Sequence, residues 1–156
     1  MKGKSKVIDR LQGQLKTELT AVHQFLLHAE MCNNWGYLRL AEHSKSEAME
    51  ELGHAQSLME RILFLEGQPN MQELADLRIG QDVKGQFEND LALEAGTVPE
   101  LNESIAIATS ERDNTSRELF EKILIDEEEH VDWLEAQLGM IDQMGLGVYL
   151  SEQMKD

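Results

Sequence analysis

The chain has 156 residues, of which 41% are hydrophobic, so residues 1–156 suit one domain with a packed core and not an intrinsically disordered chain. A net charge of −16 argues against nucleic acid as a partner and favours cations. No stretch is apolar enough to span a membrane or to act as a signal peptide, and Cys32 is alone, so we expect a reduced, cytoplasmic protein without membrane contact.

Only two prolines interrupt long runs of good helix formers, which predicts an all-α protein. Residues 7–33 read as a first helix and residues 38–66 as a second, with a turn at residues 33–36 between them. The core-facing stripe of the first helix is Leu11, Leu15, Glu18, Val22 and Phe25. The stripe of the second is Ala48, Glu51, Ala55, Leu58, Ile62 and Leu65. In both helices a glutamate therefore stands in an otherwise apolar row.

Residues 67–82 show no clear periodicity and read as a long connection. Fully extended, such a segment reaches roughly 50 Å, whereas a helix of about 28 residues is roughly 42 Å long. The connection can therefore cross the length of a bundle and start the third helix at the far end. This arrangement is a four-helix bundle with a long crossover between its second and third helices.

The third helix is expected from residue 83 and a fourth after a turn at residues 111–114, with Asn114 or Thr115 as its N-cap. The stripe of the third is Phe87, Leu91, Glu94, Val98, Leu101 and Ile105, and that of the fourth is Phe120, Ile123, Glu127, His130 and Leu134. Gly96 and Pro99 predict a kink in the third helix. Gly139 and Gly145 are expected to break the fourth, and residues 146–154 to form a short fifth.

One short pattern occurs twice in the chain. Glu51 and His54 are three residues apart, as are Glu127 and His130, so each pair stands on one helix face. The triplet 18, 51, 54 recurs at 94, 127, 130, each member 76 positions later. The midpoint of each hairpin's two glutamates falls at its turn, so all six side chains should meet at one height.

Four buried carboxylates without lysine or arginine in the same stripes would be costly. Two divalent cations would neutralise them, and oxygen ligands with some imidazole suit iron or manganese. The combination of one glutamate from each of two helices with Glu-x-x-His from the other two is the general pattern of ferritin-like di-metal proteins. The competing interpretation, in which the four glutamates face solvent, is disfavoured because all four interrupt core stripes. Glu47, Glu50, Glu121 and Asp126 could guide iron or simply form a solvated acidic face. For His23, His28 and His43 we expect surface or hydrogen-bonded core positions.

With these residues in view, the chain resembles the bacterioferritins over nearly its whole length. The matching stretches are residues 1–3, 7–8, 34–36, 61–67, 90–94 and 126–128, followed by His130 and residues 132–135. The resemblance implies a ferritin-like bundle with a di-iron ferroxidase centre. It implies bridging roles for Glu51 and Glu127, and terminal roles for Glu18 with His54 and for Glu94 with His130.

The resemblance further implies a hollow shell of 24 subunits that oxidises Fe(II) with O2 or H2O2 and stores ferric mineral. Members bind haem b through a methionine at the position that Leu52 occupies here, so we expect little or no haem. Neither Met49 nor His23 is expected to replace that ligand. Any haem would come from a co-assembled methionine-bearing subunit. Phe25 stands where relatives often carry a tyrosine.

Two other functions are compatible with a helical bundle of this kind. A rubrerythrin-like peroxidase is another di-iron bundle enzyme, but this chain has no Cys-x-x-Cys pair for the rubredoxin-like site of that type. A mainly structural subunit of a mixed bacterioferritin shell would not need the complete ligand set.

Overall fold

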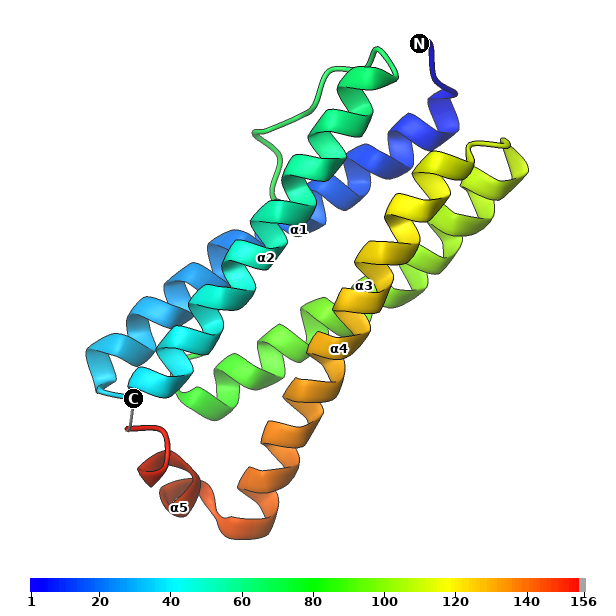
Figure 1. Ribbon diagram of the computed structural model, residues 1–156. Helices are drawn as coiled ribbons and strands as arrows, with labels where there is room; N and C mark the ends of the chain where they lie inside the picture. Colours follow the sequence, from blue (N-terminus) through cyan, green and yellow to red (C-terminus); the bar gives the residue numbers. More distant parts are fainter. Residues whose placement is uncertain (155–156) are drawn as a thin grey trace.

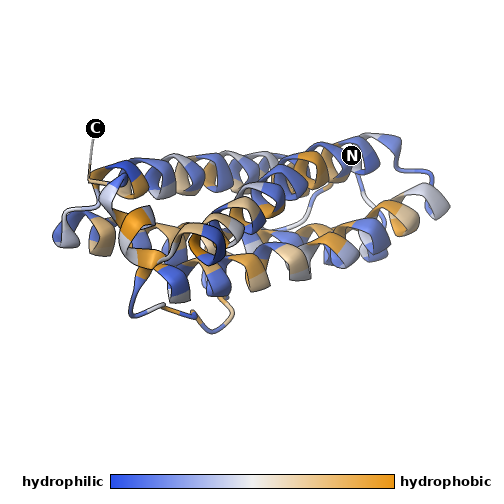
Figure 2. Cartoon of the chain, turned by 90° about the horizontal axis from the view of Figure 1, so that it is seen from below, coloured by the Kyte–Doolittle hydropathy of each residue, from blue (hydrophilic) through white to orange (hydrophobic). Residues whose placement is uncertain are grey.

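In the computed structural model, which describes residues 1–154, five helices form and no strand occurs among those residues. The helices are α1 (Ser5–Trp35), α2 (Leu38–Phe64), α3 (Val83–Ser110), α4 (Asn114–Met144) and the short α5 (Leu146–Ser151). Figure 1 shows α1 beside α2 and α3 beside α4, with α5 folded back near the far end of α4. Blue and orange residues alternate along each long helix in Figure 2, as expected for helices with one buried face. The structure confirms the predicted all-α, four-helix bundle.

The turns of the two hairpins are set by particular residues. α1 ends at Gly36, whose φ of 90° lies in the left-handed region that glycine adopts without strain, and its N–H donates to the carbonyl of Asn33. α4 begins after Asp113, whose carboxylate accepts from the backbone N–H and the hydroxyl of Ser116. The prediction that Asn114 or Thr115 caps this helix was wrong, because the carboxylate one position earlier already reaches the free N–H group.

The crossover between α2 and α3 is held by side chains of α1. Its backbone N–H groups donate to polar side chains that are spaced along α1, so an irregular segment is fixed without any strand. The four bonds are Asn70 to Gln12, Ala75 to Thr20, Arg78 to Gln24 and Gly80 to His28, at 3.0, 3.0, 3.1 and 3.0 Å. The crossover lets α2 and α3 run in the same direction.

The buried face of α3 is more polar than the sequence pattern predicted. Leu91, Val98 and Ile105 are only half-buried, whereas three neighbouring polar residues are buried. They are buried because α1 provides their partners. The contacts are Arg10 to Ser104 at 2.9 Å, Gln14 to Thr97 at 3.2 Å and Gln24 to Asp90 at 2.7 Å. The contact between the two hairpins is therefore hydrogen-bonded along α1 and α3.

Three boundaries differ from expectation. α4 continues through Gly139 to Met144, and only Gly145, with φ of 84°, ends it. One glycine costs a helix interior about 1 kcal/mol, which the packing of neighbours such as Ile141 offsets. α5 stops at Ser151 and not at residue 154. α3 runs unbroken past Pro99, and a kink there stays a prediction.

Candidate di-metal centre

Each of the four long helices contributes one glutamate to the middle of the bundle. Glu18, Glu51, Glu94 and Glu127 are 1%, 0%, 1% and 2% exposed. They occupy the apolar rows predicted from the sequence, so the alternative in which they face solvent is wrong. Their positions follow from helical periodicity, because each lies three or four residues from core side chains on its own helix.

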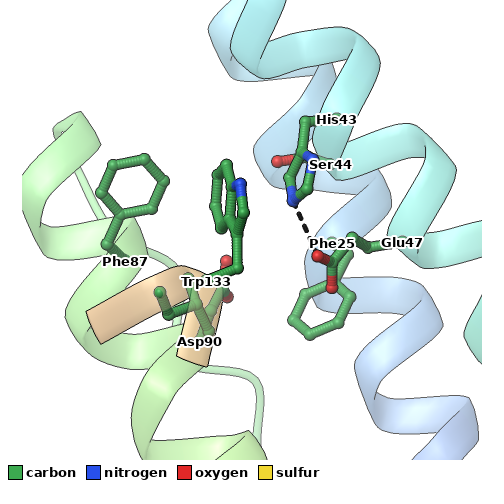
Figure 3. A pocket seen from close by; sticks show the side chains of 8 residues that line it. Phe25, His43, Ser44, Glu47, Phe87, Asp90 and Trp133 are labelled. Carbon is green, nitrogen blue, oxygen red and sulfur yellow. Dashed lines mark ion pairs between the residues drawn. The ribbon is translucent and has the colours of Figure 1, made fainter. Parts of the chain in front are cut away.

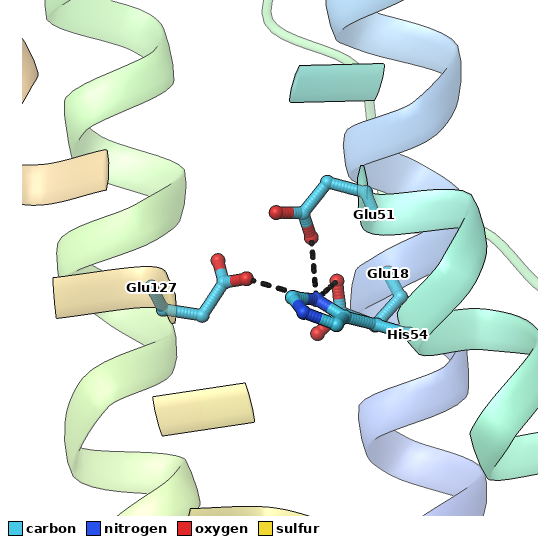
Figure 4. Close-up of side chains that lie close together, drawn as sticks. All are labelled: Glu18, Glu51, His54 and Glu127. Atoms are coloured by element: carbon cyan, nitrogen blue, oxygen red, sulfur yellow. Dashed lines mark ion pairs between the residues drawn. The ribbon is translucent and has the colours of Figure 1, made fainter. Parts of the chain in front are cut away.

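His54 gathers one half of the site. Its Nδ1 lies 3.6 Å from Glu18 Oε2, 3.8 Å from Glu51 Oε2 and 3.3 Å from Glu127 Oε1. Figure 4 shows the three carboxylates converging on this ring from α1, α2 and α4. One ligand atom from each of these four residues lies within 4.8 Å of the others, which is a spacing that one metal ion can bridge.

His130 gathers the other half in the same way. Its Nδ1 lies 3.1 Å from Glu51 Oε1, 3.6 Å from Glu94 Oε1 and 3.9 Å from Glu127 Oε2. These four residues form a second group within 4.8 Å. The two groups share Glu51 and Glu127, whose two oxygens face opposite histidines. All six residues singled out in the sequence therefore come together as two overlapping clusters.

The far nitrogen of each histidine contacts a carboxylate on the other hairpin. His54 Nε2 lies 2.7 Å from Asp126 Oδ2, and His130 Nε2 lies 3.0 Å from Glu50 Oε2. Because a carboxylate accepts, Nε2–H is the donor, and Nδ1 is the nitrogen that faces the glutamates. From the sequence, Glu50 and Asp126 were expected either to guide iron or to form a solvated acidic face, and their contacts with the two imidazoles were not predicted. The signal that could have found them is their own 76-residue spacing.

The pKa values of the clustered side chains show how unfavourable it is to bury several carboxylates together. Burial, and then the charge of Glu18, raises the pKa of Glu51 well above its usual value, and the same two causes raise the pKa of Glu127. Burial also opposes ionisation of Glu18, but contacts with Glu51 and His54 outweigh it and lower its pKa. Burial would lower the pKa of both histidines. The carboxylates outweigh it, Glu51 foremost for His130, whose pKa rises to about 10, and Glu127 foremost for His54.

The cluster leaves an unusual number of buried polar atoms without a hydrogen-bond partner. Buried polar atoms are normally paired, so such a set requires an explanation. Within residues 1–154, no lysine or arginine forms an ion pair with the four glutamates. Of the ten unpartnered buried atoms in residues 1–154, two are His28 Nδ1 and His43 Nε2, and the other eight belong to the two clusters. These eight are Glu18 Oε2, both oxygens of Glu51 and of Glu94, Glu127 Oε1, and Nδ1 of His54 and His130. Divalent cations would satisfy the eight together.

The remaining histidines lie outside this set. His28 is fully buried between Gly80 N and Asp90 Oδ1, at 3.0 Å from each, and the exposed His23 contacts the carbonyl of Leu19. His43 pairs with Glu47 and is half-buried. The expectation of surface or hydrogen-bonded histidines is met by the exposed His23 and by His28, whose Nε2 accepts from Gly80, whereas His43 is half-buried and its Nε2 forms only an ion-pair contact.

Comparisons with known proteins agree with the fold. Residues 8–144 match the ferritin-like domain family. The bacterioferritin of Mycobacterium avium is 43% identical over 152 residues, which cover 97% of this chain and 96% of that protein. The chain belongs to the bacterioferritin family. It is also similar to the bacterioferritins of Streptomyces coelicolor, 41% identical over 97% of this chain and 90% of that protein, and of Brucella melitensis, 46% identical over 93% and 90%.

None of the helices within residues 1–154 is both long and apolar enough to cross a bilayer.

Proposed function

We propose that this protein is an iron-storage ferroxidase, which oxidises Fe(II) at an intrasubunit di-iron centre. The observation that carries the proposal is the pair of overlapping carboxylate–imidazole clusters, with their unpartnered atoms, at the centre of a bacterioferritin bundle. The residues proposed to hold iron are Glu18, Glu51, His54, Glu94, Glu127 and His130.

Each group of side chains has a separate task in this proposal. Glu51 and Glu127 present one oxygen to each cluster, so they would keep two ions close enough for one molecule of O2 or H2O2 to meet both. Iron bound there supplies a one-electron redox couple at each position. Asp126 and Glu50 hold the rings of His54 and His130 so that Nδ1 faces the metals. The oxygen-rich donor set with imidazole suits iron.

Storage requires assembly, and we propose that the chain forms a closed shell of 24 subunits with ferric mineral inside. Several large apolar side chains are exposed in the isolated subunit and would be covered by neighbours, namely Leu63, Phe64, Ile125 and Val148. A net charge of −16 would attract Fe(II) toward such a shell. A monomer or dimer as the sole species in size-exclusion chromatography at neutral pH would contradict this part. The cytoplasmic location and the single domain stay predictions.

Haem does not fit the residues at the expected position. Leu52 is half-buried on α2, and a leucine side chain has no lone pair to donate to haem iron. Met49 lies about one turn earlier, about 4.5 Å along the helix axis, and its exposed fraction in the single subunit is 46%. We propose that a homo-oligomer carries little or no haem, and that haem enters only through a co-assembled subunit with a methionine ligand.

The experiment that tests the ferroxidase compares Glu127→Ala with the unmodified protein. Iron-free shells are mixed with Fe(II) and O2, and the appearance of Fe(III) is followed by absorbance. Loss of a shared carboxylate should slow oxidation at least about 100-fold, as removal of one main catalytic group commonly does. Glu103→Ala, on the exposed face of α3, serves as the control. Equal rates for Glu127→Ala and the unmodified protein would show that the assignment is wrong.

The two alternatives give different outcomes in the same assay. A rubrerythrin-like peroxidase would turn over H2O2 with an electron donor and store no mineral, and the lone buried Cys32 offers no rubredoxin-like site. A structural subunit would show oxidation no faster than Glu127→Ala. Storage of ferric mineral by the unmodified protein alone would separate the proposed function from both.

A further inference from the structure

The two halves of the centre are not equivalent. On the His130 side, Glu47 Oε2 lies 3.2 Å from His130 Nδ1, closer than the oxygens of Glu94 and Glu127 on the same nitrogen. In the part of the chain that the structure describes, Nδ1 of His54 has no such additional carboxylate. The position 76 residues after Glu47 is Ile123, a core side chain that is 1% exposed. The internal repeat therefore breaks at this point.

The carboxylate of Glu47 is held in place by an aromatic stack. Its Oε1 lies 2.7 Å from His43 Nε2, one helical turn earlier on α2. The His43 ring stacks on Trp133 with 3.6 Å between ring centroids and an angle of 15° (Figure 3). Phe87 packs edge-on against the same indole at 5.7 Å. With Oε1 paired to His43 Nε2 in this way, the other oxygen of Glu47 is left to face His130.

Glu47 is itself buried, at 8% exposure, and a small cavity of about 10 Å³ adjoins it. This volume corresponds to about one water molecule. Phe25, Ser44 and Trp133 are among the residues that line it, together with His43 and Glu47. Within residues 1–154, the Glu47 carboxylate has no protein cation beside it other than His43 and His130. It has the chemistry of a metal ligand.

A second asymmetry points the same way. On the His54 side, Gln14 Nε2 donates to Glu18 Oε1 at 2.9 Å, which occupies one oxygen of that terminal carboxylate. On the His130 side, neither oxygen of Glu94 has a partner. The residue 76 positions after Gln14 is Asp90, which accepts hydrogen bonds and has none to donate when ionised. The His130 side thus offers more carboxylate oxygens that are free to bind a metal.

We propose that Glu47 is a seventh protein ligand, which contacts the divalent cation on the His130 side alone, and that His43 is its positioning residue. The two metal positions then carry different ligand sets, four protein residues on the His54 side and five on the His130 side. This inference rests on the proposed di-metal centre. Ligand number and charge set the affinity of a site, so the His130 side binds a divalent cation more tightly because of Glu47.

Titration of metal-free shells with Co(II) tests the proposal, because its visible absorption reports the ligands without any oxidation chemistry. The unmodified protein should bind two Co(II) per subunit in two resolved steps. Glu47→Gln should weaken one step by about tenfold or more and change the spectrum of that ion only. His43→Phe keeps a ring on Trp133 but removes the ring nitrogen that pairs with Glu47, so the same step should weaken less.

Glu47→Asp separates ligand contact from charge, since it keeps the charge and withdraws the carboxylate by one methylene. It should behave like Glu47→Gln. Glu103→Gln is the control, because it makes the same change of charge at an exposed site. Both steps unchanged in Glu47→Gln, or full binding restored by Glu47→Asp, would overturn the seventh ligand while leaving the six-residue centre intact. Failure of the unmodified protein to bind two ions would overturn the centre itself, and the inference with it.

Discussion

Replacement of Glu51 by glutamine should stabilise the metal-free protein and abolish its stabilisation by metal. Glu51 is completely buried, and neither carboxylate oxygen has a hydrogen-bond partner. Burial and the charge of Glu18 raise its pKa well above the ordinary value of 4.5. In the folded chain, Glu51 must therefore hold a proton that the unfolded chain has already released, or stay ionised in a buried position beside the charge of Glu18. Glutamine has nearly the same shape and bears no charge.

The magnitude follows from linkage. A carboxyl whose folded pKa is raised costs nothing below its unfolded pKa, and destabilises the fold increasingly as pH rises above that value. Each pH unit contributes up to about 1.4 kcal/mol, so the limit at pH 7 is roughly 3 kcal/mol. The penalty of a buried unsatisfied group gives a similar range of about 1–3 kcal/mol. At 2–4 °C per kcal/mol for chains of this size, the unfolding midpoint should rise by roughly 2–12 °C.

The assay is thermal unfolding of assembled shells, followed by circular dichroism, with and without Co(II). Metal at 100 times its dissociation constant should stabilise the unmodified protein by about 2.7 kcal/mol per site, and should leave Glu51→Gln nearly unchanged. The increase in the unfolding midpoint of metal-free Glu51→Gln over the unmodified protein should shrink as the pH is lowered toward 4.5. Glu103→Gln should follow the unmodified protein throughout. A lower midpoint for metal-free Glu51→Gln, or an intact shift with metal, would refute the reasoning.

Three further predictions concern neighbouring features. Asp126→Asn weakens the partner of His54, and Co(II) affinity should fall about 10–100-fold with helicity retained; unchanged affinity would contradict this role. Asp113→Ala should cost about 1–2 kcal/mol at pH 7 by chemical denaturation. Burial opposes ionisation of Asp113, but hydrogen bonds from Ser116 and Arg61 hold its pKa below 3.8. The stability difference between Asp113→Ala and the unmodified protein should therefore vanish as the pH falls through that lowered pKa. A difference that persists in acid would contradict this role of the Asp113 carboxylate. Leu52→Met should produce a bis-methionine haem spectrum after haem supplementation, whereas the same spectrum in the unmodified protein would disprove the haem proposal.

Much of the fold, and the convergence of the six candidate side chains, could be predicted because both follow from periodicity. A glutamate in an apolar row at helical spacing must face the core, and four of them in one chain need cations. The polar seam between α1 and α3 could not be predicted in the same way. Thr97 and Ser104 belong to residue types that usually lie on the surface. Hydrogen bonds from Gln14 and Arg10, more than 80 residues away, offset the cost of burying them.

The internal repeat explains both the success and the limit of sequence reasoning about the site. Helical geometry dictates where equivalent positions lie, so Glu18 and Glu94, 76 residues apart, reach equivalent places. It does not dictate what each side chain does there. Gln14 and Asp90 are also 76 residues apart and both are buried, yet Gln14 donates to Glu18 while Asp90 accepts from Gln24. An amide can neutralise part of a carboxylate's hydrogen-bonding demand, whereas a second carboxylate can only add to it. A single substitution within the repeat is therefore enough to leave both oxygens of Glu94 without a hydrogen bond, while one oxygen of Glu18 accepts from Gln14.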